Sequence, residues 1–165
     1  MPERKTIERA RRDKREGKAP STQAGEFVRE EMEHIREGKH GARSAKQAIA
    51  IGLSKARRAG VDLRPPEKGT VSEKTRRSAK RAYEKGQRGE ASPSRTRSRA
   101  ATKALKGEGS AAASKTALSR QAHKAARKRG AAKRSAAGRK AVRTKGPAER
   151  SAAARKGART RAARA

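Results

Sequence analysis

The sequence predicts a mostly disordered chain with all-α elements: a small N-terminal helical hairpin, a third basic helix and a basic low-complexity tail. Only 16 of the 165 residues are large and apolar. Leu, Ile, Val and Phe number 13, about 8% of the chain and well below the ~20% at which a highly charged chain is expected to fold. The net charge is +32, from 48 Lys and Arg against 16 Asp and Glu. Nine of the large apolar residues lie within 21–63, so we expect any core there.

Charge and composition divide the chain into four segments. Residues 1–20 are expected to form a charged flexible arm, 21–63 a helical hairpin module, 64–90 a Pro-started basic helix, and 91–165 a disordered Ala/Lys/Arg-rich tail. The first 90 residues hold 25 basic and 14 acidic groups, whereas the last 75 hold 23 basic and two acidic groups. We place the main boundary in the Gly/Ser/Pro-containing stretch 86–94.

The N-terminal arm mixes basic and acidic residues at helical spacing. Glu8 lies four residues before Arg12, and such a pair supports a helix weakly. The segment ends at Ala19-Pro20, so we expect a frayed helix at most.

The hairpin's first helix is expected from about Gln23 to Glu37. It has an amphipathic stripe made of Phe27, Val28, Met32 and Ile35. Gly38 is positioned to end it. Four acids lie toward its start, where the helix macrodipole favours negative charge: Glu26, Glu30, Glu31 and Glu33. We interpret their charge as structural rather than as a contact for a basic partner.

The second helix has the clearest local signal. Ser44 followed by Gln47 fits a capping box, and Gly60 with Val61 fits a Schellman-type end. One face is rich in small residues, which lets a partner helix approach closely: Ala45, Ala48, Ile49, Gly52, Leu53 and Ala56. We therefore expect a hairpin with a turn near 38–41.

The third helix and the tail are more basic. After Pro65-Pro66, Thr70 and Glu73 predict a capping box for a helix that runs to about Lys85 and docks weakly at best. Residues 110–129 are rich in Ala, the best helix former. Because like charges repel, we expect this segment to fold only on binding a polyanion.

A polyanionic partner follows from the charge, since neutralising phosphates releases condensed counterions. Duplex DNA is favoured over RNA because only Phe27 and Tyr83 are available to stack on bases. Membrane insertion is not expected, because no apolar stretch is long enough. The residues predicted to contact phosphate are Arg57, Arg58, Arg76, Arg77, Lys80, Arg81, Arg95, Arg97, Arg99, Lys124, Arg127, Lys128, Arg129, Lys133, Arg134, Arg139 and Lys140.

The sequence shows no pattern of an enzyme, a small-molecule substrate site or a cofactor site. Cysteine is absent, and neither a Walker-type loop nor a Ser/His/Asp arrangement is evident. His34, Glu37 and His40 follow one another at three-residue steps, but Gly38 interrupts the helix between them. We therefore expect surface histidines and no metal site.

Two segments resemble known proteins. Lys46–Ser54, followed by Ala56–Gly60, resembles a small, poorly characterised bacterial family that pairs this helix with an upstream segment like Glu31–His40. The tail is similar in composition to bacterial linker-histone-like proteins, and Ser92-Pro93-Ser94-Arg95 resembles the Ser-Pro turns of linker-histone tails that enter A/T-rich minor grooves. These resemblances imply a bacterial cytoplasmic protein that binds the nucleoid.

The functional hypothesis is a histone-like, sequence-nonspecific, nucleoid-associated DNA-binding protein that neutralises phosphates. One alternative is an RNA- or ribosome-associated basic protein, and another is a disordered stress protectant. In a further alternative, the 21–63 module is a protein-docking surface, with Phe27, Ile35, Ile51 and Leu63 as contacts. The N-terminus has no secretory signal pattern, so we expect the protein to stay in the compartment where it is made.

Overall fold

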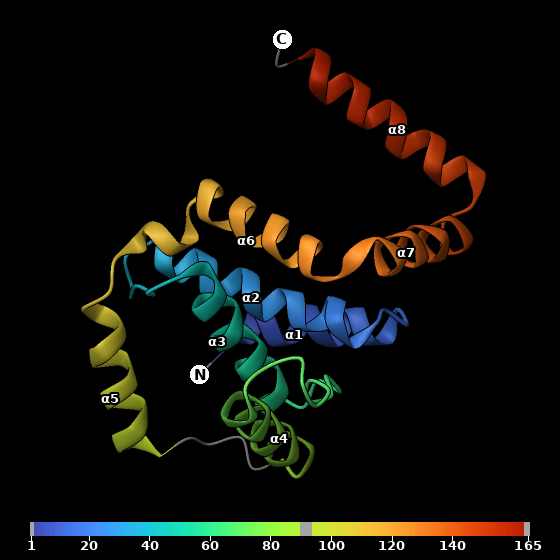
Figure 1. The fold of residues 1–165 in the computed structure, drawn as a ribbon. Coiled ribbons are helices and arrows are strands. Elements are labelled where there is room, and N and C mark those ends of the chain that lie inside the picture. Colours follow the sequence, from blue (N-terminus) through green and yellow to red (C-terminus); the bar gives the residue numbers. More distant parts are fainter. Residues whose placement is uncertain (1, 90–93, 164–165) are drawn as a thin grey trace. The chain divides into compact units, whose positions relative to one another are not determined.

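Helices make up the regular structure of the chain. The computed structural model describes residues 2–89 and 94–163, and these contain eight α-helices, one 3₁₀ helix and no strand (Figure 1). The elements are α1 (Arg4–Arg15), α2 (Pro20–Arg36), α3 (Ala45–Arg58), α4 (Glu73–Gln87), α5 (Arg95–Lys106), the 3₁₀ helix η1 (Ser110–Ala113), α6 (Lys115–Lys128), α7 (Gly130–Thr144) and α8 (Pro147–Ala162). The prediction of a mostly disordered chain is therefore wrong.

Alanine explains why the composition argument failed. Of the 14 buried hydrophobic residues among those described, ten are alanine. Alanine has the highest helix propensity, and its small side chain lets helix backbones approach one another closely. A count of large apolar residues misses this contribution, so it underestimates the core that the chain builds.

The antiparallel pair α2 and α3 is the centre of the fold and corresponds to the expected hairpin. At Gly52, an added methyl group would lie 2.7 Å from Val28 Cα and 3.0 Å from the Phe27 carbonyl oxygen, so the two helices meet here at backbone distance. Two apolar clusters lie along the pair. One consists of Met32, Ile35, Ala42, Ala48, Ala112 and Ala113. The other consists of Ala10, Ala24, Phe27, Ala56 and Val61.

Both predicted helix ends of the hairpin are confirmed. Gly38 (φ +72°) and Gly60 (φ +84°) have left-handed backbones. Each is followed by the 6→1 hydrogen bond of a Schellman motif. It runs from Lys39 N–H to the His34 carbonyl (3.0 Å) and from Val61 N–H to the Ala56 carbonyl (3.1 Å). These ends direct the chain back toward the helix that precedes them.

The predicted N-terminus of α3 is also confirmed. The Ser44 hydroxyl accepts a hydrogen bond from Gln47 N–H at 3.2 Å. The Gln47 side-chain oxygen accepts the return bond from Arg43 N–H (2.9 Å), one residue earlier than in the standard capping box.

Helix α4 begins elsewhere than predicted. Its N-cap is Ser72, which accepts a bond from Thr75 N–H at 3.3 Å, whereas the Thr70 hydroxyl donates to the Glu67 carbonyl. The capping box predicted from Thr70 and Glu73 is therefore wrong, because a second hydroxyl two residues later is better placed for the helix. Ala79 and Ala82 are buried, and α4 packs on α3.

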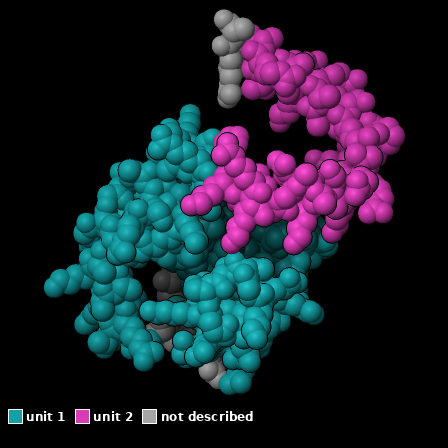
Figure 2. Space-filling view, viewed as in Figure 1, with its two compact units in different colours: residues 1–121 teal, residues 122–165 magenta. Residues whose placement is uncertain are grey.

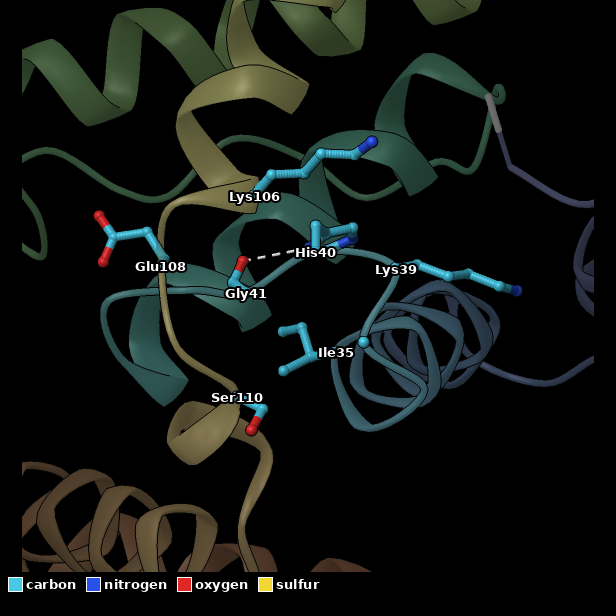
Figure 3. Close-up of a pocket in the computed structure, with 8 residues that line it drawn as sticks. Ile35, Lys39, His40, Gly41, Lys106, Glu108 and Ser110 are labelled. Atoms are coloured by element: carbon cyan, nitrogen blue, oxygen red, sulfur yellow. Dashed lines mark hydrogen bonds between the residues drawn. The ribbon is translucent and has the colours of Figure 1, made fainter.

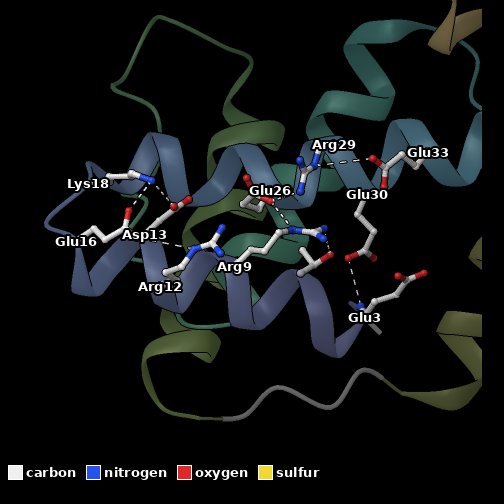
Figure 4. A network of polar contacts seen from close by, with 11 residues as sticks. Glu3, Arg9, Arg12, Asp13, Glu16, Lys18, Glu26, Arg29, Glu30 and Glu33 are labelled. Carbon is white, nitrogen blue, oxygen red and sulfur yellow. Dashed lines mark hydrogen bonds and ion pairs between the residues drawn. The ribbon is translucent and has the colours of Figure 1, made fainter. Parts of the chain in front are cut away.

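The N-terminal segment is a docked helix rather than the flexible arm that we predicted. Helix α1 packs on α2, with Thr6 and Ala10 buried. A polar seam holds the two together: Arg9 Nε lies 2.7 Å from Glu26 Oε2, and Glu3 N–H donates to Glu30 (Figure 4). The sequence pairs Arg12 with Glu8. In the structure the i,i+4 ion pair of Arg12 is with Glu16 instead, at 3.9 Å.

The segment predicted to be a disordered tail is helical, and its beginning belongs to the core. Gly41 N–H donates to the Leu105 carbonyl (2.8 Å), and Ala42 N–H donates to the Gly109 carbonyl (3.1 Å). Ala112 and Ala113 of η1 complete the first apolar cluster. The predictions of a low-complexity unfolded tail and of folding only on binding are therefore wrong, because alanine propensity and these contacts already order the chain.

The chain divides into two compact units, residues 1–121 and 122–165 (Figure 2). The boundary falls within α6, whereas the boundary that the sequence predicts, in 86–94, lies inside the first unit. Residues 95–121 are grouped with the first unit because η1 packs on α2 and α3.

Candidate functional site

Most of the predicted phosphate contacts are exposed. Arg95, Arg97 and Arg99 lie exposed on α5 in the first unit. Other exposed residues of the set lie in the second unit, on the end of α6, at the α6–α7 junction and on α7. These residues are Lys124, Arg127, Lys128, Arg129, Lys133, Arg134, Arg139 and Lys140. The predicted set thus divides between the two units of the chain.

The second unit is strongly cationic and lacks a core of its own. Residues 122–165 contain 16 Lys and Arg but one acid, Glu149. Neither α7 nor α8 buries a residue. Basic residues occur on all sides of α8, at Arg150, Arg155, Lys156, Arg159 and Arg161, since these positions differ by irregular steps around a helix of 3.6 residues per turn. Such helices offer positive charge in several directions at once.

Arg57 is a wrong choice for a phosphate contact. It is 7% exposed, and its guanidinium donates to the carbonyls of Leu63 (3.0 Å) and Arg64 (3.5 Å). Burial lowers the pKa of Arg57 from its ordinary value, yet an arginine in a protein stays charged. The residue therefore holds the segment after α3 in place instead of meeting a ligand.

The other predicted cations of the first unit divide into two kinds. Arg76 forms two bonds to the Glu73 carboxylate, at 2.9 and 3.0 Å. Arg77 Nε lies 3.5 Å from the same carboxylate, and Lys80 Nζ lies 3.7 Å from Glu84 Oε1. The remaining two, Arg58 and Arg81, are exposed. Three of the four predicted cations on α4 thus lie beside an acid of the same helix.

The Ser-Pro motif is only partly within the described residues. Ser92 and Pro93 lie outside them. Ser94 is the N-cap of α5 and Arg95 is its first residue. Arg95 is therefore placed in a helix rather than in an extended turn.

Two of the four proposed docking contacts are core residues. Phe27 is 1% exposed and Ile35 is 0% exposed. Ile51 and Leu63 are half-buried. The proposed docking surface is wrong for the first two residues, because the α2 stripe faces α3 and α1 instead of a partner.

A pair of buried acids is the feature that sequence reasoning missed. Glu30 and Glu31 are 1% and 0% exposed. Lys55 Nζ of α3 lies 2.6 Å from Glu31 Oε2 and 3.7 Å from Glu30 Oε1. Because α2 begins at Pro20, these acids lie in its second half, so the macrodipole at the helix start is the wrong explanation for them. Their charge is structural through contacts with other elements.

Two histidines border this acidic pair, contrary to the prediction of surface histidines. The side chains of His34 and His40 are 13% and 12% exposed. His40 Nε2 lies 3.4 Å from Glu31 Oε1, and its Nδ1 donates to the Gly41 carbonyl at 3.1 Å. The Schellman turn at Gly38 brings His40 back over α2, whereas Glu37 is exposed and pairs with Lys39.

The rim of this cluster is formed by the start of α1. His34 Nε2 lies 2.8 Å from Glu3 Oε1, and Lys39 Nζ lies 3.4 Å from the same oxygen. Hydrogen bonds from His34 and then Lys39 lower the pKa of Glu3. The spacing Glu31-x-x-His34 on one helix face was a signal that could have been read from the sequence.

A shallow pocket of about 490 Å³ opens beside His40 (Figure 3). Its lining comes from the end of α2, the turn after it and the α5–η1 connection: Ile35, Gly38, Lys39, His40, Gly41, Lys106, Glu108 and Ser110. The polar cluster and the pocket thus share His40.

No helix among the described residues combines the length and the apolar composition needed to cross a membrane. Comparison of the chain with models of protein families, with curated proteins and with solved structures gives no match.

Proposed function

We propose that this chain is a histone-like, nucleoid-associated protein that binds duplex DNA without sequence preference by neutralising phosphates. The observation that supports the proposal most directly is the charge of the second unit, which contains 16 basic residues and one acid. A helix at 1.5 Å per residue makes α7 about 22 Å long. It carries five cations, Lys133, Arg134, Arg139, Lys140 and Arg143, all of them exposed.

The absence of Phe, Tyr and Trp from residues 122–165 supports phosphate contact over base stacking. An α-helix fits the major groove of B-form DNA, whereas the deep, narrow major groove of A-form RNA excludes it. A helix with cations on several sides reaches phosphates on both walls of such a groove. These arguments favour duplex DNA as the partner and the nucleoid as the location.

The stress-protectant alternative required an unfolded chain, and the helical structure removes that basis. The RNA- or ribosome-associated alternative uses the same electrostatics and is decided by experiment. Affinities for a random-sequence duplex DNA, a duplex RNA and a single strand of equal length are to be compared at physiological salt. We expect the duplex DNA to bind most tightly; preference for either RNA would overturn the DNA assignment.

The phosphate contacts are tested by the salt dependence of binding. A full-length variant with Lys133, Arg134, Arg139 and Lys140 replaced by Gln is expected to lower the slope of log K against log salt by about 3–4, since each phosphate contact contributes ~0.9. The control replaces four exposed cations of α1, Lys5, Arg11, Lys14 and Arg15, and removes the same charge. We expect the control to change the slope by less than about 1. Equal slopes for the two variants would refute the role of α7.

A further inference from the structure

We propose that Glu31, His34 and His40 form a binding site for a single Zn²⁺ ion. One carboxylate oxygen and two imidazole nitrogens from these residues lie within 4.8 Å of one another. Zinc takes nitrogen and oxygen ligands at about 2.0–2.2 Å, so tetrahedral ligand atoms are about 3.3 Å apart. Binding requires side-chain rotations that bring the three groups to that separation. The proposal is independent of DNA binding.

The hydrogen bonding of His40 points to a cation between His40 and Glu31. A carbonyl oxygen only accepts, so Nδ1 of His40 carries the proton that binds the Gly41 carbonyl. A neutral ring then presents the lone pair of Nε2 to Glu31 Oε1, 3.4 Å away, which is also an acceptor. Two acceptors facing each other repel, and a cation bonded to both atoms removes the repulsion.

One oxygen of the Glu31 carboxylate lacks a hydrogen bond and is therefore free to coordinate a metal ion. It is fully buried, and Oε1 accepts no hydrogen bond from any of the described residues. Its second oxygen lies 2.6 Å from Lys55 Nζ. A buried carboxylate oxygen without a hydrogen bond is costly, so Oε1, which lies near both histidines, is suited to coordinating an ion.

The local charge also favours a cation. Glu30 and Glu31 carry two negative charges in the interior, and Lys55 supplies one positive charge. At the rim, Lys39 offsets the charge of Glu3. One negative charge remains in this sum, so the cluster attracts a cation.

The surrounding groups resemble the outer contacts of metal-bound histidines, which donate their second ring N–H to a carbonyl or carboxylate. His40 contacts the Gly41 carbonyl in this way, and His34 contacts the Glu3 carboxylate at 2.8 Å. Of the three ligands only His40 also lines the neighbouring pocket. A zinc ion with three protein ligands commonly takes water as the fourth. The bound ion would join α2 to the turn that follows it.

The test is a calorimetric titration of the full-length protein with ZnCl₂. The protein is first freed of nucleic acid and treated with a chelator. We expect one Zn²⁺ per chain. Glu31→Gln, which keeps the side-chain shape, and His40→Gln are each expected to weaken binding at least tenfold. The control is His123→Gln, because His123 is the third histidine of the chain and is exposed on α6.

A second readout separates loss of the site from loss of the fold. Far-UV circular dichroism of Glu31→Gln is expected to match the wild type. Zn²⁺ is expected to raise the melting temperature of the wild type and of His123→Gln, but not that of Glu31→Gln. The proposal is overturned if the wild type binds no Zn²⁺ at micromolar concentrations. It is equally overturned if Glu31→Gln and His40→Gln bind as tightly as His123→Gln does, which would leave a protonated His40 as the partner of Glu31.

Discussion

At the scale of single residues, some polar side chains make structural contacts that the sequence pattern does not reveal. Tyr83 is the only tyrosine, and its hydroxyl donates to Asp62 Oδ1 at 2.7 Å, which ties α4 to the segment after α3. Arg57 binds the carbonyls of that same segment from the inside. Both residues therefore fix the path of the chain between α3 and α4.

The Tyr83 contact predicts a measurable titration. The hydrogen bond to Asp62 favours the neutral phenol and raises the pKa of Tyr83 above its ordinary value of 10.0. The stability that this bond contributes is complete below about pH 10 and is lost as the pH rises through the folded-state pKa. Since the chain has no tryptophan, absorbance at 295 nm reports Tyr83 alone.

Replacing the partner tests the cause of this shift. Asp62→Asn removes the carboxylate charge and is expected to move the midpoint of the Tyr83 titration down toward the value for a free tyrosine. Asp13→Asn, a change of the same charge far along the chain, serves as the control and is expected to leave the midpoint in place. Identical midpoints for wild type and Asp62→Asn would refute the contact.

At the scale of elements, small residues set how closely the helices approach. A methyl group at Gly52 meets the backbone of Val28, whereas a methyl group at Gly25, on the same pair of helices, meets nothing within 4 Å. Backbone atoms do not rotate away as side chains do. The α2–α3 spacing therefore depends on Gly52 and not on glycine in general.

This difference predicts opposite effects of one chemical change. Gly52→Ala is expected to reduce the free energy of unfolding by about 1–3 kcal/mol, as overpacking does in other cores. Gly25→Ala is expected to raise it by about 0.5–1 kcal/mol, because alanine is the better helix former at an exposed site. Urea denaturation followed by circular dichroism measures both. A neutral Gly52→Ala would show that the helices are farther apart in solution.

At the scale of the whole molecule, charge and packing divide differently along the sequence. Net charge changes near residue 90, but the core extends to the contacts of Leu105, Gly109, Ala112 and Ala113 with the hairpin. The first unit thus includes a segment whose composition resembles the second. Composition alone places the boundary too early.

Two truncations distinguish these boundaries. A chain ending at residue 121 is expected to unfold at nearly the same urea concentration as the full-length protein. A chain ending at residue 90 is expected to be less stable by about 3–4 kcal/mol, because two buried methyl groups contribute ~0.8 kcal/mol each and two backbone hydrogen bonds ~1 kcal/mol each. Equal stability of the two truncated chains would contradict the role of η1 in the core.

The sequence by itself determined the features that depend on neighbours a few residues apart. Ser44 with Gln47, Gly38 and Gly60 mark helix ends through local hydrogen bonds, and the small-residue face around Gly52 follows from helical periodicity. The excess of basic residues in the second half is likewise a property of composition. These predictions needed no knowledge of the rest of the fold.

Only the tertiary structure decided which polar residues are buried. The burial of Glu31 and Arg57 and the approach of His34 to His40 depend on where α3, the Gly38 turn and the start of α1 lie. The contribution of alanine to the core was also decided there, because an alanine supports a core only when another backbone comes close. The physical reason is that burial and desolvation arise from contacts between residues far apart in the chain, and a local pattern does not specify them.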